Sequence, residues 1–138
     1  MMKSFLFMTD YYFINDGSLT PDNNMNYIIH TPSATRLKQE ITKCVSEKID
    51  ANGNGIATWQ CVETDGSDKV FVHTKDQWAE KGCIALHHNV PRNELQVRFY
   101  YWDSWKDRAL ADDKIMLGRF TELILVHFSY LIDKIIIE

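Results

Sequence analysis

The chain has 138 residues, of which 45% are hydrophobic and 25% are charged, and its formal net charge is −4. This length and composition are typical of one globular domain and exclude a disordered chain, so we expect a single domain over residues 1–138. The acidic balance argues against a general nucleic-acid-binding protein, which would present a basic face to the phosphates.

The first third of the chain predicts two strands and a helix. An aromatic-rich run at residues 4–14 predicts a strand, and the turn-forming residues 15–26 predict a surface loop. Residues 27–30 predict a second, short strand. From residue 32 to residue 50, apolar side chains recur every three or four positions, which predicts an amphipathic helix. Thr31-Pro32 has the residue types of a helix start, with the hydroxyl at the N-cap.

The middle of the chain predicts two β-hairpins. The β-rich runs 55–63 and 69–74 flank the turn-forming pair Asp65-Gly66. Residues 74–82 predict one or two helical turns that end at Gly82. A second hairpin follows, in which the runs 83–88 and 94–102 flank a turn, and alternate residues of its last strand face opposite sides of the sheet.

The last part of the chain predicts a long helix from about Asp112 to Ile132, with Asp112 or Asp113 near its N-cap. Apolar side chains lie all round this helix, so we expect the sheet and the first helix, or a second copy of the chain, to cover it on more than one side. Residues 134–138 continue the helix or form a strand, and three consecutive β-branched residues favour the strand. The chain therefore predicts an α+β fold: a mainly antiparallel sheet of about five strands with two principal helices packed against it.

Residues 50–61 have part of the pattern of a calcium-binding loop. Asp50, Asn52 and Asn54 occupy alternate positions, and Gly55 follows. Such a loop needs a bidentate glutamate at its twelfth position, but that position is Cys61, a soft ligand that calcium avoids. We therefore interpret these residues as a helix end and a turn.

The histidines and cysteines do not have the spacing of a metal site, and we expect neither a metal ion nor a cofactor. His87 and His88 are adjacent on a predicted strand and so point to opposite faces. The sequence leaves open a small enzyme or small-molecule binder with a pocket between the sheet and the last helix, in which Cys83, His87 and His127 would take part.

No leader peptide or membrane span is expected. Asp10 interrupts the first apolar run, and ionisable residues interrupt the apolar stretch at 115–137. The three cysteines are widely separated and form no C-x-x-C pair, which favours reduced thiols. These features predict a cytoplasmic protein.

Residues 99–113 form the most unusual stretch, in which four consecutive aromatic residues precede a segment rich in aspartate. Tryptophan is enriched at the centres of protein interfaces, and acidic groups around it would steer a basic partner. The alternative is that the tryptophans cover a sheet edge and the aspartates cap the last helix. The candidate partner-binding residues are Trp102, Asp103, Trp105, Asp107, Asp112 and Asp113, and we expect the four aspartates to be largely solvated.

The sequence contains no catalytic constellation, so the leading hypothesis is a small acidic protein that acts through protein–protein contact. An immunity protein or antitoxin that neutralises a bacterial toxin fits this size and charge, since many toxins are basic nucleases. We expect a basic protein partner, and no nucleic acid or membrane. The apolar last helix is also a candidate homodimer interface.

Overall fold

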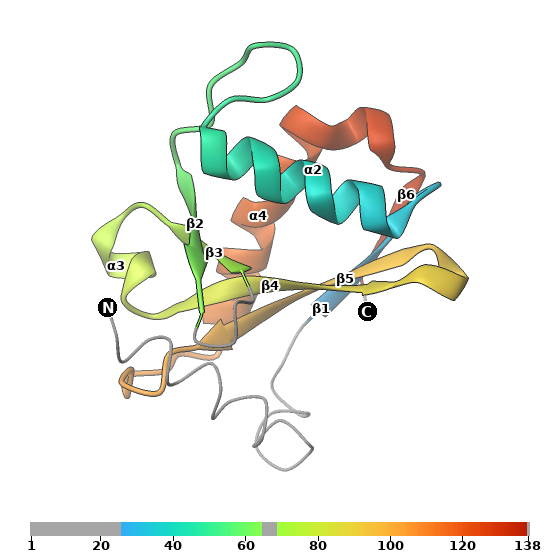
Figure 1. Ribbon diagram of the computed structural model, residues 1–138. Coiled ribbons are helices and arrows are strands. Elements are labelled where there is room, and N and C mark those ends of the chain that lie inside the picture. The colour runs from blue at the N-terminus through green and yellow to red at the C-terminus, as the bar shows by residue number, and fades with distance from the viewer. Residues whose placement is uncertain (1–25, 65–68, 138) are drawn as a thin grey trace.

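The structure is a computed structural model that describes residues 26–64 and 69–137. The predicted strand at 4–14, the loop up to residue 25 and the turn at Asp65-Gly66 lie outside the described residues. Within them, the predicted α+β architecture is confirmed, with the main helices above one sheet (Figure 1).

The described part of the chain forms one antiparallel sheet of six strands, one more than predicted, in the order β2-β3-β4-β5-β1-β6. The strands are β1 (Asn26–His30), β2 (Trp59–Glu63), β3 (Lys69–His73), β4 (Gly82–Asn89), β5 (Glu94–Tyr101) and β6 (Lys134–Ile137). The two predicted hairpins are confirmed as β2–β3 and β4–β5, and residues 134–137 form a strand. β1 lies between β5 and β6, so strands from both ends of the described chain complete one side of the sheet.

Two substantial helices pack against the same face of the sheet. They are α2 (Ala34–Glu47) and α4 (Asp112–Phe128); α3 (Asp76–Ala79) connects β3 to β4, and the 3-10 turns η1 (Val90–Arg92) and η2 (Ser129–Leu131) follow β4 and α4. The apolar sides of α2 and α4 pack against alternate residues of the strands and form the main core with them. The most buried large side chains of this core include Trp59, Phe71, Phe99, Phe120 and Phe128. A smaller cluster lies on the opposite face and includes Val70, Val72, Cys83, Ala85, Tyr100 and Trp102.

The helix ends differ from the sequence prediction. Ser33, rather than Thr31, caps α2 by accepting a hydrogen bond from the backbone N–H of Arg36. The Thr31 hydroxyl instead donates to the carbonyl of Leu131, 2.7 Å away, and so joins β1 to the end of the last helix. α2 ends at Glu47, because Lys48 adopts a left-handed conformation and its N–H bonds back to the helix.

The sheet and α2 do not enclose α4 by themselves, so the first of the two expected covers is wrong, while cover by a second copy stays a prediction. The side facing the sheet and α2 is buried, but Leu125 and Val126 on the other side remain 52% and 69% exposed. Asp112 and Asp113 lie in the first turn of α4, directly after the N-cap residue Ala111, so the prediction that they lie near the N-cap is confirmed. Among the described helices, none has both the length and the apolar character that a bilayer crossing requires.

Candidate functional site

The predicted partner-binding residues lie in and beside the connection from β5 to α4, which we call the 102–111 loop. Backbone and indole hydrogen bonds fix the start of this loop. The backbone N–H of Trp102 donates to the carbonyl of Lys81, and its indole Nε1–H donates to the carbonyl of Ala79; both distances are 2.8 Å. Within the loop, the Trp105 indole donates to the carbonyl of Asp107. Trp102 is therefore a buried anchor that ties the start of the loop to the segment between α3 and β4.

Asp112 does not belong to the loop surface, and the prediction that it is solvated is wrong. Its carboxylate is buried and accepts hydrogen bonds from the Lys81 ammonium at 2.8 Å, from the Tyr101 hydroxyl at 2.9 Å and from the Ala109 N–H at 2.9 Å. Burial alone would raise the pKa of Asp112, but the hydrogen bonds from Lys81, Ala109 and Tyr101 bring it below its ordinary value. This buried ion pair closes the C-terminal end of the loop.

The remaining aspartates divide into two groups. Asp113 is buried in the first turn of α4, where its carboxylate accepts from the N–H of Lys114, so the expectation of a solvated side chain is wrong there as well. Asp103 and Asp107 are exposed, as predicted. Only these two of the four carboxylates are free to meet a partner at the surface.

The exposed part of the loop is a mixture of apolar, aromatic and charged groups. Leu110 is 92% exposed, which is the largest value among the exposed apolar side chains of the described residues. Trp105 is half-buried, and the Lys81 ammonium lies 5.7 Å from its ring centroid. The Arg108 guanidinium stacks 4.7 Å from the ring of Tyr101. Sequence reasoning missed Leu110 as a site residue, although an isolated large aliphatic side chain in a polar loop was the signal.

Cys83, His87 and His127, the predicted participants of an alternative pocket, do not meet. Cys83 and His87 lie on the sheet face opposite the helices, where the His87 ring hydrogen-bonds the Tyr100 hydroxyl at 2.7 Å. Complete burial raises the pKa of the Cys83 thiol, which opposes thiolate chemistry. His127 lies on α4, on the other face of the sheet. It lines a small cavity of about 180 Å³ between α4 and strands β2 and β3.

His127 instead pairs with Asp50, in the segment 50–61 that has part of the pattern of a calcium-binding loop. One carboxylate oxygen of Asp50 accepts from the backbone N–H groups of Asn52 and Asn54, at 2.9 and 2.8 Å, and the other lies 2.7 Å from Nδ1 of His127. Both oxygens therefore face hydrogen-bond donors, and Gly53 adopts the positive φ that the turn requires. The segment has the geometry of a hydrogen-bonded turn.

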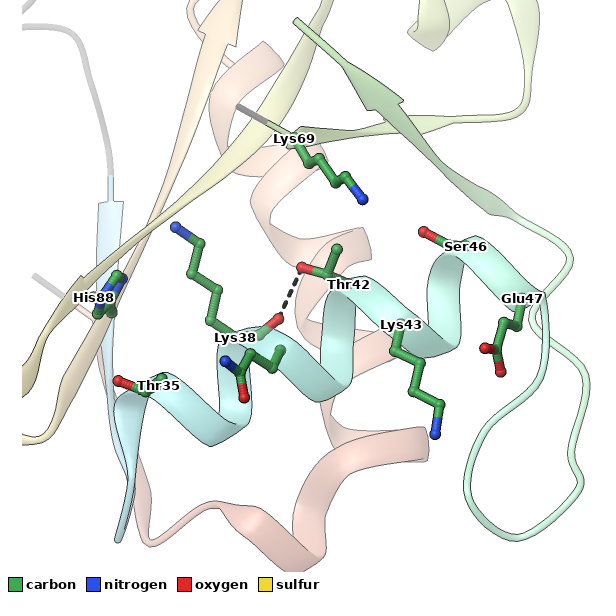
Figure 2. A pocket seen from close by; sticks show the side chains of 9 residues that line it. Thr35, Lys38, Thr42, Lys43, Ser46, Glu47, Lys69 and His88 are labelled. Carbon is green, nitrogen blue, oxygen red and sulfur yellow. Dashed lines mark hydrogen bonds between the residues drawn. The ribbon is translucent and has the colours of Figure 1, made fainter. Parts of the chain in front are cut away.

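A second concave surface, which sequence reasoning missed, lies along α2. It is a groove of about 640 Å³ between this helix and the ends of β3 and β4 (Figure 2). The groove is lined by Thr35, Lys38, Gln39, Thr42, Lys43, Ser46, Glu47, Lys69 and His88. The charged residues of α2 looked like an ordinary solvated face, and nothing local in sequence places Lys69 or His88 opposite them.

Comparisons of the chain with protein-family models, with curated proteins and with solved structures found no match. Within residues 26–64 and 69–137, no group of three or more His, Cys, Asp or Glu side chains is arranged to hold a metal ion. Any statement about function therefore has to come from the geometry of the 102–111 loop and of the groove along α2.

Proposed function

We propose that the protein is a binding protein that acts through protein–protein contact, with the 102–111 loop as its recognition surface. The observation that carries this proposal is the exposure of Leu110 on a loop whose two ends are fixed. A large aliphatic side chain that contacts water over 92% of its surface contributes little to the fold. It is available as an anchor for a pocket on a partner.

The fixed loop supports the proposal energetically. Ordering a flexible loop on binding costs conformational entropy, and a loop that is already ordered avoids most of that cost. Here Trp102 holds one end and the buried pair of Lys81 and Asp112 holds the other. Trp105, half-buried in the same loop, adds a rigid aromatic surface of the kind that often dominates binding energy.

The partner we propose is a basic protein in the cytoplasm. Asp103 and Asp107 are exposed on the loop, and the chain as a whole has a net charge of −4, so a positively charged partner would be steered toward it. An inhibitor or immunity protein that neutralises a basic toxin, such as a nuclease, is the class that this size and charge favour.

Site-specific photo-crosslinking tests the recognition surface. A photo-reactive amino acid is placed at position 110 in one variant and at position 90 in another, and both are expressed in the organism that encodes the chain. Val90 is a matched control because it is 54% exposed but lies in η1, outside the loop. We expect one protein to crosslink from position 110 and not from position 90. Equal crosslinking from the two positions would contradict the proposed surface.

The purified partner then gives a quantitative test. Leu110→Ala should weaken its binding by about 30-fold, which corresponds to a loss of about 2 kcal/mol. The melting temperature should stay unchanged, because the Leu110 side chain is not packed. Replacing Asp103 and Asp107 with Asn should mainly slow association at low salt, where surface charges are least screened. If Leu110→Ala and Trp105→Ala both leave the affinity unchanged, the proposal is wrong.

The inhibitor assignment needs its own readout. The wild-type chain should suppress an activity of the crosslinked partner, such as cleavage of nucleic acid, and Leu110→Ala should suppress it only at higher concentration. A partner that is acidic, or whose activity the chain leaves unchanged, would remove the toxin-inhibitor assignment while leaving the contact surface in place.

A homodimer through α4 is a second proposal, supported by one observation. Leu125, Val126 and Tyr130 keep more than half of their surface exposed on one side of α4 and in η2. Sedimentation of the wild-type chain should then show a dimer, and Val126→Asp should give a folded monomer whose melting temperature no longer depends on protein concentration. A wild-type chain that sediments as a monomer at high concentration would contradict this proposal.

A further inference from the structure

The groove along α2 gathers positive charge from two separate elements. Lys38 and Lys43 come from α2, whereas Lys69 begins β3 on the other wall. In Figure 2 the side chains of Lys38 and Lys69 extend into the space between the helix and the sheet. Among the described residues of the lining, Glu47 is the one acidic side chain beside three lysines, in a chain whose net charge is negative.

These lysines have no carboxylate partners in the described part of the chain. The salt bridges there join His30 and Arg92 to Glu94, Lys81 to Asp112 and His127 to Asp50, and none of them involves Lys38, Lys43 or Lys69. A bound anion would therefore meet ammonium groups that form no salt bridge with a described carboxylate.

Polar uncharged groups lie between the cations. A row of hydroxyls runs along one face of α2. Thr42 follows Thr35 by two helical turns, and Ser46 follows Thr42 by one turn. The Thr42 hydroxyl donates to the carbonyl of Lys38 at 2.8 Å, which keeps its oxygen available as an acceptor. His88, near the end of β4, supplies an imidazole from the sheet side of the groove. The groove therefore combines charge with several hydrogen-bonding groups.

We propose that this groove binds a small molecule that carries phosphate groups, held between Lys38 and Lys69. Lysine binds phosphate as a point charge, and two ammonium groups on opposite walls suit an anion with more than one charged oxygen. The Thr42 hydroxyl, one helical turn after Lys38, would meet a hydroxyl group of the same molecule. This ligand site is separate from the 102–111 loop and does not depend on the function proposed there.

The size and lining of the groove favour a compact ligand. A volume of about 640 Å³ lies within the range of roughly 300–1,000 Å³ that small-molecule sites occupy. The described residues of the lining include no Phe, Tyr or Trp side chain on which a nucleobase would stack. A small polyphosphate or a phosphorylated sugar fits this chemistry better than a nucleic acid.

Titration with inorganic pyrophosphate, followed by calorimetry and by amide NMR shifts, tests the site. We expect saturable binding with the largest shifts at residues 35–47, 69 and 88. Lys69→Gln and Lys38→Gln should each weaken binding by about tenfold, the effect of losing one charge-assisted hydrogen bond. Glu47→Gln should strengthen binding, because it removes the negative charge from the lining. These side chains are at least partly exposed, so the variants should fold normally.

Lys114→Gln is the matched control, since it removes the same charge from an exposed position on α4, outside the groove. It should change the pyrophosphate affinity by less than about twofold, as expected when only the net charge of the chain changes. Citrate, which has similar charge but no phosphate, should bind more weakly. The proposal is wrong if pyrophosphate does not bind at about 10 mM, well above the usual range for metabolites. It is also wrong if Lys114→Gln weakens binding as much as Lys69→Gln, or if citrate or an oligoglutamate peptide binds as tightly as pyrophosphate.

Discussion

His127 near the end of α4 hydrogen-bonds Asp50 in the turn after α2, with Nδ1 and Oδ2 2.7 Å apart, although the two residues are 77 positions apart in the chain. An ionised carboxylate only accepts hydrogen bonds, so Nδ1 carries the proton and donates it. The pair ties the last helix to the turn that closes the first one. It also uses a carboxylate that a calcium loop would have offered to the metal.

This pair predicts a specific acid sensitivity. The hydrogen bond from His127, together with the backbone N–H groups of Asn54 and Asn52 and against the opposing effect of burial, lowers the pKa of Asp50 to about 2. Because the folded pKa lies below the unfolded one, the stabilisation is complete above the ordinary value of about 4 and is lost as the pH falls toward 2. Asp50→Asn should therefore lower the free energy of unfolding at pH 6, and the difference from wild type should shrink by pH 3.

Urea unfolding at a series of pH values between 6 and 2.5 measures that difference. Asp107→Asn is the matched control, since its carboxylate is exposed, and it should change stability little at any of these pH values. A difference between wild type and Asp50→Asn that stays constant down to pH 2.5 would show that Asp50 does not titrate as the geometry requires.

Neighbouring residues of α4 should respond very differently to truncation. Leu123 and Ile124 are buried in the main core, so replacing either with Ala should cost roughly 2–5 kcal/mol of stability. Leu125 and Val126 follow directly but are exposed, and the same replacement there should cost less than about 0.5 kcal/mol. Chemical denaturation of the four variants measures both effects. A similar loss at all four positions would mean that α4 is also covered on its outer side.

Gly82, at the start of β4, should not tolerate a methyl group. A Cβ at this position would overlap the carbonyl oxygen of Tyr100 and approach the ring of Phe99, so we expect Gly82→Ala to cost about 1–3 kcal/mol. Gly118 in α4 is the control, because a Cβ there meets open space. Gly118→Ala should stabilise the protein by about 0.5–1 kcal/mol through helix propensity. Thermal melts that show the same sign for both variants would contradict this packing.

The ion pair beneath the 102–111 loop should be structural. Asp112→Ala leaves the Lys81 ammonium and the Tyr101 hydroxyl without their shared acceptor, and should cost at least about 2 kcal/mol. Asp103→Ala removes an exposed carboxylate and should cost less than about 0.5 kcal/mol. Hydrogen exchange should show faster exchange at residues 102–111 in the first variant alone. If Asp112→Ala melts like wild type, the pair does not hold the loop.

Local sequence patterns were enough to predict most of the individual elements. The alternation of apolar residues in β5 and the three β-branched residues of β6 both predicted strands that the structure contains. The spacing of apolar residues predicted α2, although its ends shifted because the N-cap is Ser33 and the chain turns at Lys48. These predictions succeeded because the determining interactions lie within a few residues of one another.

The candidate sites depended on contacts that no local pattern encodes. Asp112 looked like a solvated helix-capping residue, and its burial follows from Lys81, which is 31 positions earlier. The groove along α2 was hidden because its second wall comes from Lys69 and His88, on strands that sequence alone did not place opposite the helix. The place of β1 between β5 and β6 was equally unpredictable, since a short strand offers no signal of which neighbours it will pair with.

The position of β1 between β5 and β6 affects how the chain folds while it is being synthesised. Asn26 and Gln96, whose side chains bond across β1 and β5, are 70 positions apart, and Thr31 and Leu131 are 100 positions apart. At a synthesis rate of roughly 5–20 residues per second, β1 waits on the order of 4–14 s before β5 has been translated, and longer for β6. During that time its hydrophobic residues have no strand to pair with. A growing chain of this topology is therefore exposed to chaperones, and to misfolding, until β6 has been translated.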